Sequence, residues 1–210
     1  MKPLRVLVGC ESSGAVREAF RALGHDAWSC DILPADDGSP AHFQCDVFGP
    51  LQCQRWDLLI AFPPCTYVCG SGIHWNSRRP ERAKLTEQAV RFFRDLLEAD
   101  VPRIALENPV GILSNRIRKP DQIIQPYEFG DDASKKTCLW LKGLPPLQPT
   151  RRVPGRKIVH NGRTVERWSN QTDSGQNRLG PSDDRWKERS RTYNGIAQAM
   201  AQQWGCHPVI

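Results

Sequence analysis

Two residues that could form a catalytic pair, Cys65 and Glu107, each follow a short apolar run. Cys65 ends a Phe-Pro-Pro-Cys sequence at 62–65, and Glu107 begins a Glu-Asn-Pro sequence at 107–109. The consecutive prolines restrict the backbone before Cys65 and would hold its thiol in a fixed position. A thiol beside a carboxyl group can carry out covalent catalysis with proton transfer. Taken alone, each residue has an ordinary alternative, a buried structural cysteine or a helix-capping acid.

A third segment, from Val8 to Ala15, joins an apolar run to the start of a helical pattern. Its small residues would let a ligand approach the backbone, and the N-terminus of the following helix offers free N–H groups to a carboxylate. Asp31 lies about twenty residues further on, where an acid can hold ribose hydroxyls. Asp46 ends a later short element and could receive an adenine amino group. Loop capping is the ordinary alternative for each aspartate.

Strands and helices that alternate along the chain would position these residues. Strands are predicted at 4–8, 26–30, 58–61 and 104–106, and helices at 15–23, 81–98 and 194–204. This alternation predicts an α/β fold with a Rossmann-like, mostly parallel sheet and helices on both faces. Such sheets bind ligands at the carboxyl ends of their strands. Because the turn, the thiol and the acid all follow strands, we expect them at one edge of the sheet.

The positive charge of the chain is concentrated in one segment. The 210 residues carry a net charge of +6, and 151–191 alone holds eleven Lys and Arg against five Asp and Glu. A local excess of this kind indicates a polyanionic partner, although a solvated face is the alternative. The segment has no clear hydrophobic period, which predicts a flexible insertion or a small irregular subdomain. Its aromatic residues Trp168 and Trp186, with Tyr193 just beyond it, could stack on single-stranded bases or pack locally.

The cysteines and the apolar runs bear on compartment and metal content. None of the eight cysteines forms a Cys-x-x-Cys pair, so we expect no metal site. Because the α/β pattern is that of an enzyme without an export signal, we expect reduced thiols. No apolar run approaches the ~20 residues that a membrane span needs, and no export signal is recognisable. We therefore expect a cytoplasmic protein that does not enter a membrane.

Together these motifs resemble those of the C5-cytosine DNA methyltransferases, particularly short phage or prophage-type members. Pro63-Pro64-Cys65 matches the catalytic loop of that family, 107–109 resembles its Glu-Asn-Val motif, and 8–14 its first cofactor motif. Residues 129–137 resemble a degenerate Gly-x-Pro-Gln-x-Arg-x-Arg motif, with Ala133 and Thr137 in place of Gln and Arg. Residues 193–196 resemble the last motif, whose Asn helps close the cofactor pocket. The resemblance covers residues 5–147 and 191–204.

The resemblance implies a class I S-adenosylmethionine-dependent methyltransferase that acts on DNA. A cytosine would be flipped into the pocket, Cys65 would add to C6, and Glu107 would hold the N3 and amino edge while C5 takes the methyl group. Loss of the C5 proton would then expel Cys65. We expect a polar or basic pocket to lower the pKa of Cys65, with Lys135 and Lys136 nearby. The glycine-rich loop at 69–72 could close over the base.

The same resemblance divides the chain into a catalytic domain at 1–147, a reduced basic recognition segment at 148–190, and a C-terminal helix at 191–210. The turn, the aspartates and the family motifs assign a cofactor pocket to Gly9, Cys10, Glu11, Ser12, Gly14, Asp31, Asp46, Pro63 and Asn194. The candidate nucleic-acid-binding residues are Lys135, Lys136, Arg151, Arg152, Arg156, Lys157 and Arg163. Three alternatives stay open: the same chemistry on RNA or a free cytosine nucleotide, a non-catalytic nucleic-acid-binding relative that works with a separate recognition subunit, and transfer of a different group from a modified cofactor.

Overall fold

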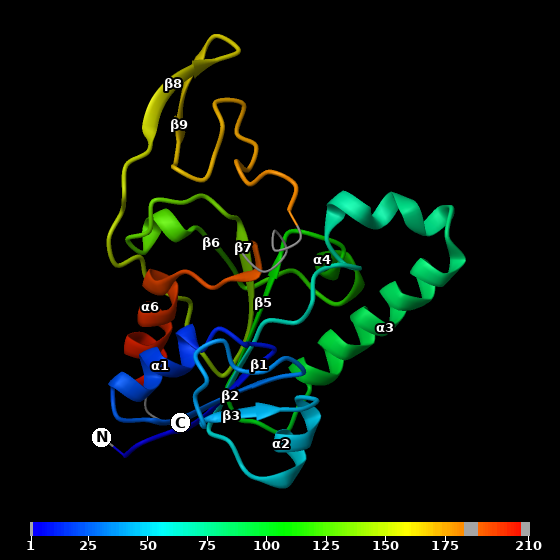
Figure 1. The fold of residues 1–210 in the computed structure, drawn as a ribbon, viewed down its shortest axis with the longest axis vertical. Helices are drawn as coiled ribbons and strands as arrows, with labels where there is room; N and C mark the ends of the chain where they lie inside the picture. Colours follow the sequence, from blue (N-terminus) through cyan, green and yellow to red (C-terminus); the bar gives the residue numbers. More distant parts are fainter. Residues whose placement is uncertain (1, 183–188, 207–210) are drawn as a thin grey trace.

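The computed structural model describes residues 2–182 and 189–206, which form a central sheet with helices packed on it (Figure 1). The strands of the central sheet are β1 (Arg5–Gly9), β2 (Asp26–Asp31), β3 (His42–Gln44), β4 (Leu58–Ala61), β5 (Ile104–Pro109), β6 (Gln122–Ile124) and β7 (Thr137–Lys142). They lie in the order β3-β2-β1-β4-β5-β7-β6. The pairs among β1 to β5 are parallel, whereas β7 runs antiparallel to both β5 and β6.

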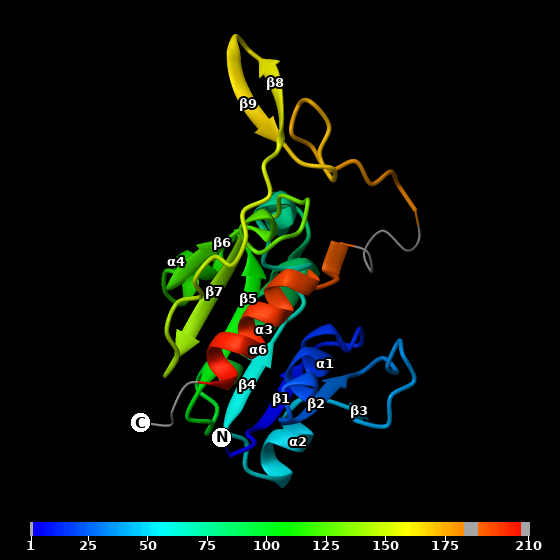
Figure 2. The ribbon, with the colours of Figure 1, turned by 90° about the vertical axis from the view of Figure 1, so that its left-hand side faces the viewer.

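Helices cover both faces of this sheet, as Figures 1 and 2 show. One face carries α1 (Ala15–Ala22) and α6 (Asn194–Gly205), and the other carries α2 (Phe48–Cys53), α3 (Pro80–Leu97) and α4 (Leu113–Arg116). Two short 3-10 helices, η1 (Gly70–Ser77) and η2 (Pro126–Glu128), lie in the connections. Among the described helices, none is both long and apolar enough to cross a membrane.

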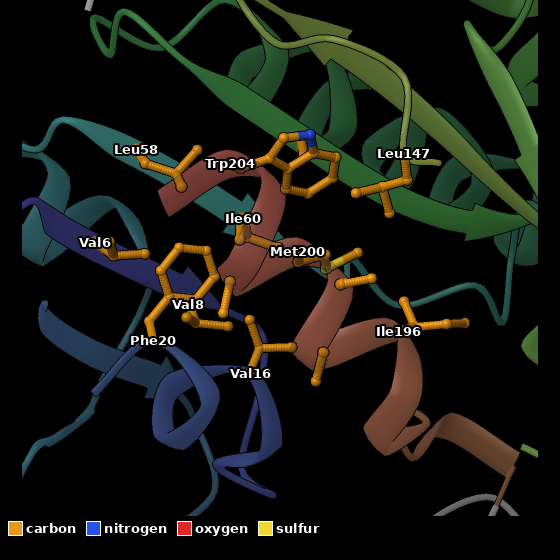
Figure 3. Packing of buried hydrophobic residues seen from close by; sticks show 14 of the residues in the cluster. Val6, Val8, Val16, Phe20, Leu58, Ile60, Leu147, Ile196, Met200 and Trp204 are labelled. Atoms are coloured by element: carbon orange, nitrogen blue, oxygen red, sulfur yellow. The ribbon is translucent and has the colours of Figure 1, made fainter. Parts of the chain in front are cut away.

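The alternation of side chains along β1 and β4 separates two cores. Val8 and Ile60 face α1 and α6, where they pack with Phe20 and Met200 (Figure 3). Their neighbours along the strands point the other way, toward α3 and α4, because successive residues of a strand face opposite sides of the sheet. Strands buried on both faces explain the continuous apolar runs in the sequence. The predicted Rossmann-like α/β fold is therefore confirmed.

One segment differs from its predicted character. Residues 151–191 were expected to be irregular, yet they contain an antiparallel hairpin of β8 (Arg156–His160) and β9 (Arg163–Arg167). Asn161 and Gly162 form its two-residue turn with φ of 51° and 73°. An Asn-Gly pair between β-branched residues is a strong hairpin signal, because both positions of this turn require positive φ. The high charge of the segment makes this hairpin pattern hard to recognise in the sequence.

The strand order reverses between β1 and β4. Open α/β sheets bind ligands at such a switch point, beyond the carboxyl ends of the strands. Figure 2 shows that β4 and β5 point toward the end of the molecule from which the β8–β9 hairpin rises. The switch point and the hairpin therefore lie toward the same end.

Candidate active site at the carboxyl edge of the sheet

A hydrogen bond joins the two motifs that carry Cys65 and Glu107. Asn108, on β5, is buried with 1% exposure, and its side-chain amide donates to the backbone carbonyl of Pro63, 2.7 Å away. Pro63 is itself buried just beyond β4. Because β4 and β5 are paired neighbours, this bond fixes the proline turn against the acid-bearing strand. The sequence placed Asn108 beside Glu107 but gave no role to its side chain.

The chain after Cys65 folds back on itself and is held by the segment that follows β5. The backbone N–H of Cys69 donates to the carbonyl of Cys65 at 3.0 Å, and that of Ile112 donates to the carbonyl of Val68 at 2.9 Å. A Cβ atom on Gly111 would lie far inside van der Waals contact with that Val68 carbonyl oxygen. Only glycine therefore permits this close approach of two backbones behind the cysteine.

The start of α3 holds the outer side of the same loop. The Arg82 guanidinium donates to the carbonyls of Thr66 and Gly72 at 2.9 and 3.2 Å, and it lies 5.0 Å from the ring centroid of Tyr67. Thr86 donates to the carbonyl of Tyr67 at 3.1 Å. In the segment 69–72, expected to close over a base, residues 70–72 form the start of η1 and are anchored by Arg82.

The pKa of Cys65 is raised, which contradicts the expected lowering. Desolvation by the surrounding chain is the main cause, and the negative charges of Cys69 and Glu107 add to it. Lys135 acts in the opposite direction and lowers the pKa. The thiol is nonetheless exposed at the surface, so it is accessible but held mainly in its neutral form.

Glu107 has a raised pKa as well, and desolvation is again the leading cause, while Lys135 and the Thr137 hydroxyl lower it. The carboxyl lines a small open cavity that Phe62 and Tyr193 also line. Lys136, expected beside the site, instead lowers the pKa of Cys138. A carboxyl group in this setting can hold a proton at a pH where an ordinary glutamate has lost it.

Three side chains meet where β1, β2 and β3 end. Burial raises the pKa of Cys10 to about 12, and the carboxylates of Asp31 and Asp46 raise it further by their charge. Each aspartate also accepts a backbone N–H two residues on, at 2.9 Å, from Leu33 and Phe48 respectively. The loop-capping alternative therefore holds for one oxygen of each, while the charge of both carboxylates also acts on Cys10.

Glu11 occupies the N-terminus of α1, which was expected to offer free N–H groups. It is 4% exposed, and it accepts the backbone N–H of Val16 at 2.8 Å and that of Arg17 at 3.4 Å. Burial raises the pKa of Glu11 to about 7 against the opposing effect of these bonds. The chain's own carboxyl group, rather than a ligand, thus caps this helix.

Arg17 is a buried cation that the sequence reading missed. It is fully buried, donates to the Ser29 hydroxyl at 2.7 Å, and forms an ion pair with Asp37. Ser29 in turn contacts Nδ1 of His42 at 2.8 Å. The position of this arginine, on the helix face that carries Val16 and Phe20, was the sequence signal that could have predicted its burial. These contacts hold the loop between β2 and β3, which carries Asp31 at its start.

The other predicted pocket residues have varied surroundings. A Cβ on Gly9 would lie 2.7 Å from Val47, so glycine is needed there for packing. Gly14 has a φ of 71°, and the Ser12 carbonyl accepts the N–H of Asp36 at 2.9 Å. Asn194 is exposed at the start of α6, and it is the preceding residues, 190–193, that line the cavity with Glu107.

The expected nucleic-acid-binding arginines divide into two groups. Arg151 donates to the Gly130 carbonyl at 3.1 Å, Arg152 pairs with Glu166, and Arg156 pairs with Asp173 at 2.6 Å. These three guanidinium groups therefore hold the base of the hairpin together. Lys157 and Arg163 are exposed on its outer half.

An aromatic stack anchors the hairpin to the body. The rings of Tyr127 and Trp168 lie 3.9 Å apart at an angle of 7°, and Arg152 lies 5.8 Å from the Tyr127 centroid. The backbone of Ser134, next to Lys135, exchanges two 2.9 Å hydrogen bonds with the Asn170 side chain. Trp168 thus packs locally instead of presenting a face for stacking, and Trp186 lies outside the described residues.

The side chains of Asp31, Asp46 and Ile32 fit the adenosine part of the expected cofactor. An adenosine group presents hydroxyl and amino donors, and Asp31 and Asp46, whose charges both act on Cys10, supply acceptors. Ile32, 75% exposed directly after Asp31, supplies an apolar surface for a ring. The amino-acid end of such a cofactor would have to find donors other than the N–H groups that Glu11 accepts. Within residues 2–182 and 189–206, no three His, Cys, Asp or Glu side chains gather in a way that could hold a metal.

Several solved structures are similar to this one in part, at low sequence identity. A protein assigned as a DNA modification methyltransferase encoded within an E. coli prophage is 18% identical with a TM-score of 0.46, over 66% of this chain and 46% of that one. The Entamoeba histolytica methyltransferase EhMeth is 16% identical with a TM-score of 0.47, over 76% and 62%. The S. pombe methyltransferase Dnmt2 is 16% identical with a TM-score of 0.43, over 69% and 51%. The chain thus spans less than two thirds of each. No protein-family model and no curated protein sequence matches the chain.

Proposed function

We propose that this chain is an S-adenosylmethionine-dependent methyltransferase that acts on C5 of cytosine in DNA, with Cys65 as the nucleophile. The hydrogen bond from Asn108 to the Pro63 carbonyl carries the proposal. It joins a proline-fixed thiol to a carboxyl-bearing strand beside the switch point of the sheet. The influence of Glu107 on the pKa of Cys65 supports their proximity. The resemblance of both motifs to one family gives this pairing its chemistry.

The chain's own residues would perform the covalent step. The Cys65 thiol loses its proton to solvent, to which it is exposed, and the thiolate then forms a bond to C6 of a flipped cytosine. The electron pair displaced from the C5–C6 double bond moves into the ring. Glu107, whose raised pKa favours its protonated form, donates its proton to N3 and so stabilises the adduct. Once C5 carries the methyl group, loss of the C5 proton to water re-forms the C5–C6 double bond, the thiolate leaves, and N3 returns its proton to the Glu107 carboxylate.

Lys135 would stabilise both anions of this sequence. It lowers the pKa of Cys65 and of Glu107, so it favours the thiolate before attack and the carboxylate after proton donation. Asp31, Asp46 and Ile32 would hold the adenosine part of S-adenosylmethionine, with Cys10 and Pro63 at the neighbouring strand ends. When bound, this cofactor supplies the methyl group. Residues 1–147 and 191–210 would form the catalytic domain and 148–190 a reduced recognition segment, with or without a separate recognition subunit.

Methyl transfer with labelled cofactor tests the proposal. Double-stranded DNA, single-stranded DNA, RNA and dCMP would each be offered to the wild type, to Cys65→Ala, and to Cys53→Ala, which changes another exposed cysteine. We expect 5-methylcytosine in double-stranded DNA with the wild type and Cys53→Ala, and none with Cys65→Ala. Label in RNA or dCMP alone would show that one of these, and not DNA, is the substrate. Label transferred by Cys65→Ala would refute the assignment of Cys65 as the nucleophile.

Trapping tests the C5 chemistry directly. In DNA containing 5-fluorocytosine, the C5 proton is replaced by fluorine, which cannot be lost as a proton, so the cysteine cannot be expelled. We expect a covalent protein–DNA complex with the wild type that persists in denaturant and maps to Cys65. A folded protein that transfers methyl to DNA without forming this complex would indicate transfer to a different atom of the base.

A further inference from the structure

Two thiols that take no part in the proposed reaction lie in contact beside the cofactor residues. The Sγ atoms of Cys30 and Cys45 are 3.9 Å apart, and the Cys30 thiol also donates to the Cys45 carbonyl at 3.4 Å. Packing explains Cys30, because a buried free cysteine behaves as a small apolar residue. It does not explain Cys45, which is exposed. The pair thus joins a thiol that solvent reaches to one inside the core.

The two cysteines differ in how far they can move. Cys30 lies on β2, which pairs on one side with β1, through Gly9, and on the other with β3, through Phe43. The Cys30 carbonyl also accepts the backbone N–H of Glu11 at 3.2 Å. Cys45 lies just beyond the end of β3, the edge strand of the sheet. Any approach of the two sulfur atoms must therefore come mainly from Cys45.

The sulfur atoms are close enough for a covalent bond to form after a small movement. A disulfide holds them about 2.05 Å apart, so closing the 3.9 Å gap takes about 1.9 Å of movement. Bond formation also removes the hydrogen that the Cys30 thiol donates to the Cys45 carbonyl. That carbonyl belongs to the peptide group that leads into Asp46. The bond would therefore pull on Cys45 and release the peptide that follows it.

Each cysteine directly precedes one of the two aspartates assigned to the cofactor, Asp31 and Asp46. Asp46 is held from the far side by the start of α2. Its carboxylate accepts the N–H of Phe48 at 2.9 Å, and its carbonyl accepts the N–H of Gly49 at 3.0 Å. A pull on Cys45 toward β2 opposes these two bonds, because Asp46 lies between the two attachments. Asp31 stays in place with β2.

We infer that Cys30 and Cys45 form a reversible disulfide that displaces Asp46 and weakens binding of the cofactor. The site of this modification is independent of the proposed function, whereas its effect on cofactor binding rests on that function. The bond gives the methyltransferase a redox control that works through the adenosine pocket and leaves Cys65 untouched.

A peroxide is the oxidant, and hydrogen peroxide balances the reaction in two steps. The accessible Cys45 sulfur attacks one oxygen, the O–O bond breaks, and Cys45 becomes a sulfenic acid while the second oxygen leaves as water with the thiol proton. The Cys30 sulfur then attacks the Cys45 sulfur, and the hydroxyl leaves as water with the Cys30 proton. Two thiols are oxidised and one peroxide is reduced to water. Burial raises the pKa of the Cys30 thiol, so Cys45 reacts first.

Peptide mapping of the full chain tests the bond itself. After treatment with hydrogen peroxide and blocking of free thiols, a protease that cleaves before aspartate places Cys30 in the peptide 26–30 and Cys45 in the peptide 37–45. We expect these two peptides to be joined, and to separate with dithiothreitol. A bond from Cys45 to any other cysteine, or no bond to Cys30, would overturn the inference.

Variants of three cysteines give the controls. Cys45→Ser changes an exposed residue and should form no linked peptide, whereas the matched variant Cys53→Ser, at another exposed cysteine, should form it as the wild type does. In Cys30→Ala the second step cannot occur, so dimedone, which reacts with sulfenic acids, should label Cys45. A linked peptide in wild type together with dimedone labelling of Cys30 in Cys45→Ser would reverse the order of the two steps and contradict the chemistry.

Calorimetric titration with S-adenosylmethionine, after removal of the peroxide, tests the effect on the pocket. We expect oxidation to weaken binding by about tenfold or more, the effect of losing one hydrogen bond to a charged group, and dithiothreitol to restore it. Peroxide should change the affinity of Cys53→Ser in the same way and leave that of Cys45→Ser unchanged. Equal affinity of the linked and reduced wild type, or a loss of affinity in peroxide-treated Cys45→Ser, would overturn the link to the cofactor.

Amide hydrogen exchange reports the movement of Asp46 without any ligand. Exchange of the Phe48 and Gly49 amides, whose hydrogens bond Asp46, should be faster in the linked protein, and unchanged exchange would refute the displacement. If the reduced protein binds no S-adenosylmethionine, the proposed function falls, and mapping and exchange still decide the fate of the disulfide. If the protein methylates DNA but Cys30 and Cys45 do not join, this inference falls and the proposed function stands.

Discussion

Removing the Asn108 side chain should both destabilise the protein and misplace Cys65. In Asn108→Ala, the Pro63 carbonyl loses its 2.7 Å hydrogen bond in a buried setting, which costs about 1–3 kcal/mol. Part of this is offset, because Oδ1 of Asn108 is buried without a hydrogen-bond partner in the described structure, and its removal returns about 1 kcal/mol. We therefore expect a net loss of about 0–2 kcal/mol in the free energy of unfolding, centred on about 1 kcal/mol.

Urea unfolding followed by tryptophan fluorescence measures this loss. With a slope of about 2 kcal/mol per molar, the midpoint should fall by up to about 1 M, and by about 0.5 M at the centre of the expected range. Asn115→Ala, at an exposed position of α4, is the matched control and should stay within about 0.5 kcal/mol. Methyl transfer by Asn108→Ala under native conditions should fall on the order of 100-fold, because a shift of about 1 Å in a reacting group has that effect. Unchanged methyl transfer by folded Asn108→Ala would refute the positioning role.

Three further perturbations test the electrostatics and the packing of the site. Glu107→Gln should lower the pKa of Cys65 by removing a nearby negative charge, so iodoacetamide should alkylate Cys65 faster at pH 8 in this variant, as read from its peptide by mass spectrometry; an equal or slower rate would contradict the coupling. In the folded state Glu11 keeps its proton up to pH about 7, well above the ordinary value for a glutamate. The wild type should therefore lose about 3 kcal/mol of stability from this group as pH rises from about 4.5 to about 7. Urea unfolding at several pH values should show a smaller loss of stability over this range in Glu11→Gln. Gly111→Ala should push the Val68 carbonyl and the loop behind Cys65 outward and abolish most methyl transfer, whereas wild-type activity would show that the loop absorbs the extra methyl group.

The location of Cys65 and Glu107 at one edge of the sheet could be predicted from the sequence because prolines and strand ends mark it. Cys65 follows the end of β4 by four residues and Glu107 lies near the end of β5, and the carboxyl ends of parallel strands share an edge. The contact between their motifs could not be predicted, since it depends on which strands are neighbours. Nothing in the sequence near Asn108 states that β5 pairs with β4, and only that pairing brings its amide to the Pro63 carbonyl.

Residues whose partners are distant in sequence were missed for the same reason. Arg17 meets Asp37 and Ser29 only after β2 and its loop fold over α1. Tyr127 and Trp168 lie far apart in the sequence, with β7, β8 and β9 between them, so no local pattern predicts their stack. The hairpin, by contrast, has a local signal in its Asn-Gly turn. The high charge of the segment favoured an irregular structure over a hairpin in the prediction.

The raised pKa of Cys65 changes how catalysis must begin. Desolvation is the main reason that Cys65 is held as a neutral thiol, and negative charge on Glu107 adds to it. The productive arrangement has a proton on Glu107 and a thiolate at Cys65. A cytosine whose N3 accepts a hydrogen bond from Glu107 further favours the protonated carboxyl, and this removes one of the charges that raise the pKa of Cys65. Binding of the target base would thus activate the nucleophile, while Lys135 limits the cost of either anion. An exposed cysteine at the edge of the sheet is thereby protected from unproductive reactions until the base is present.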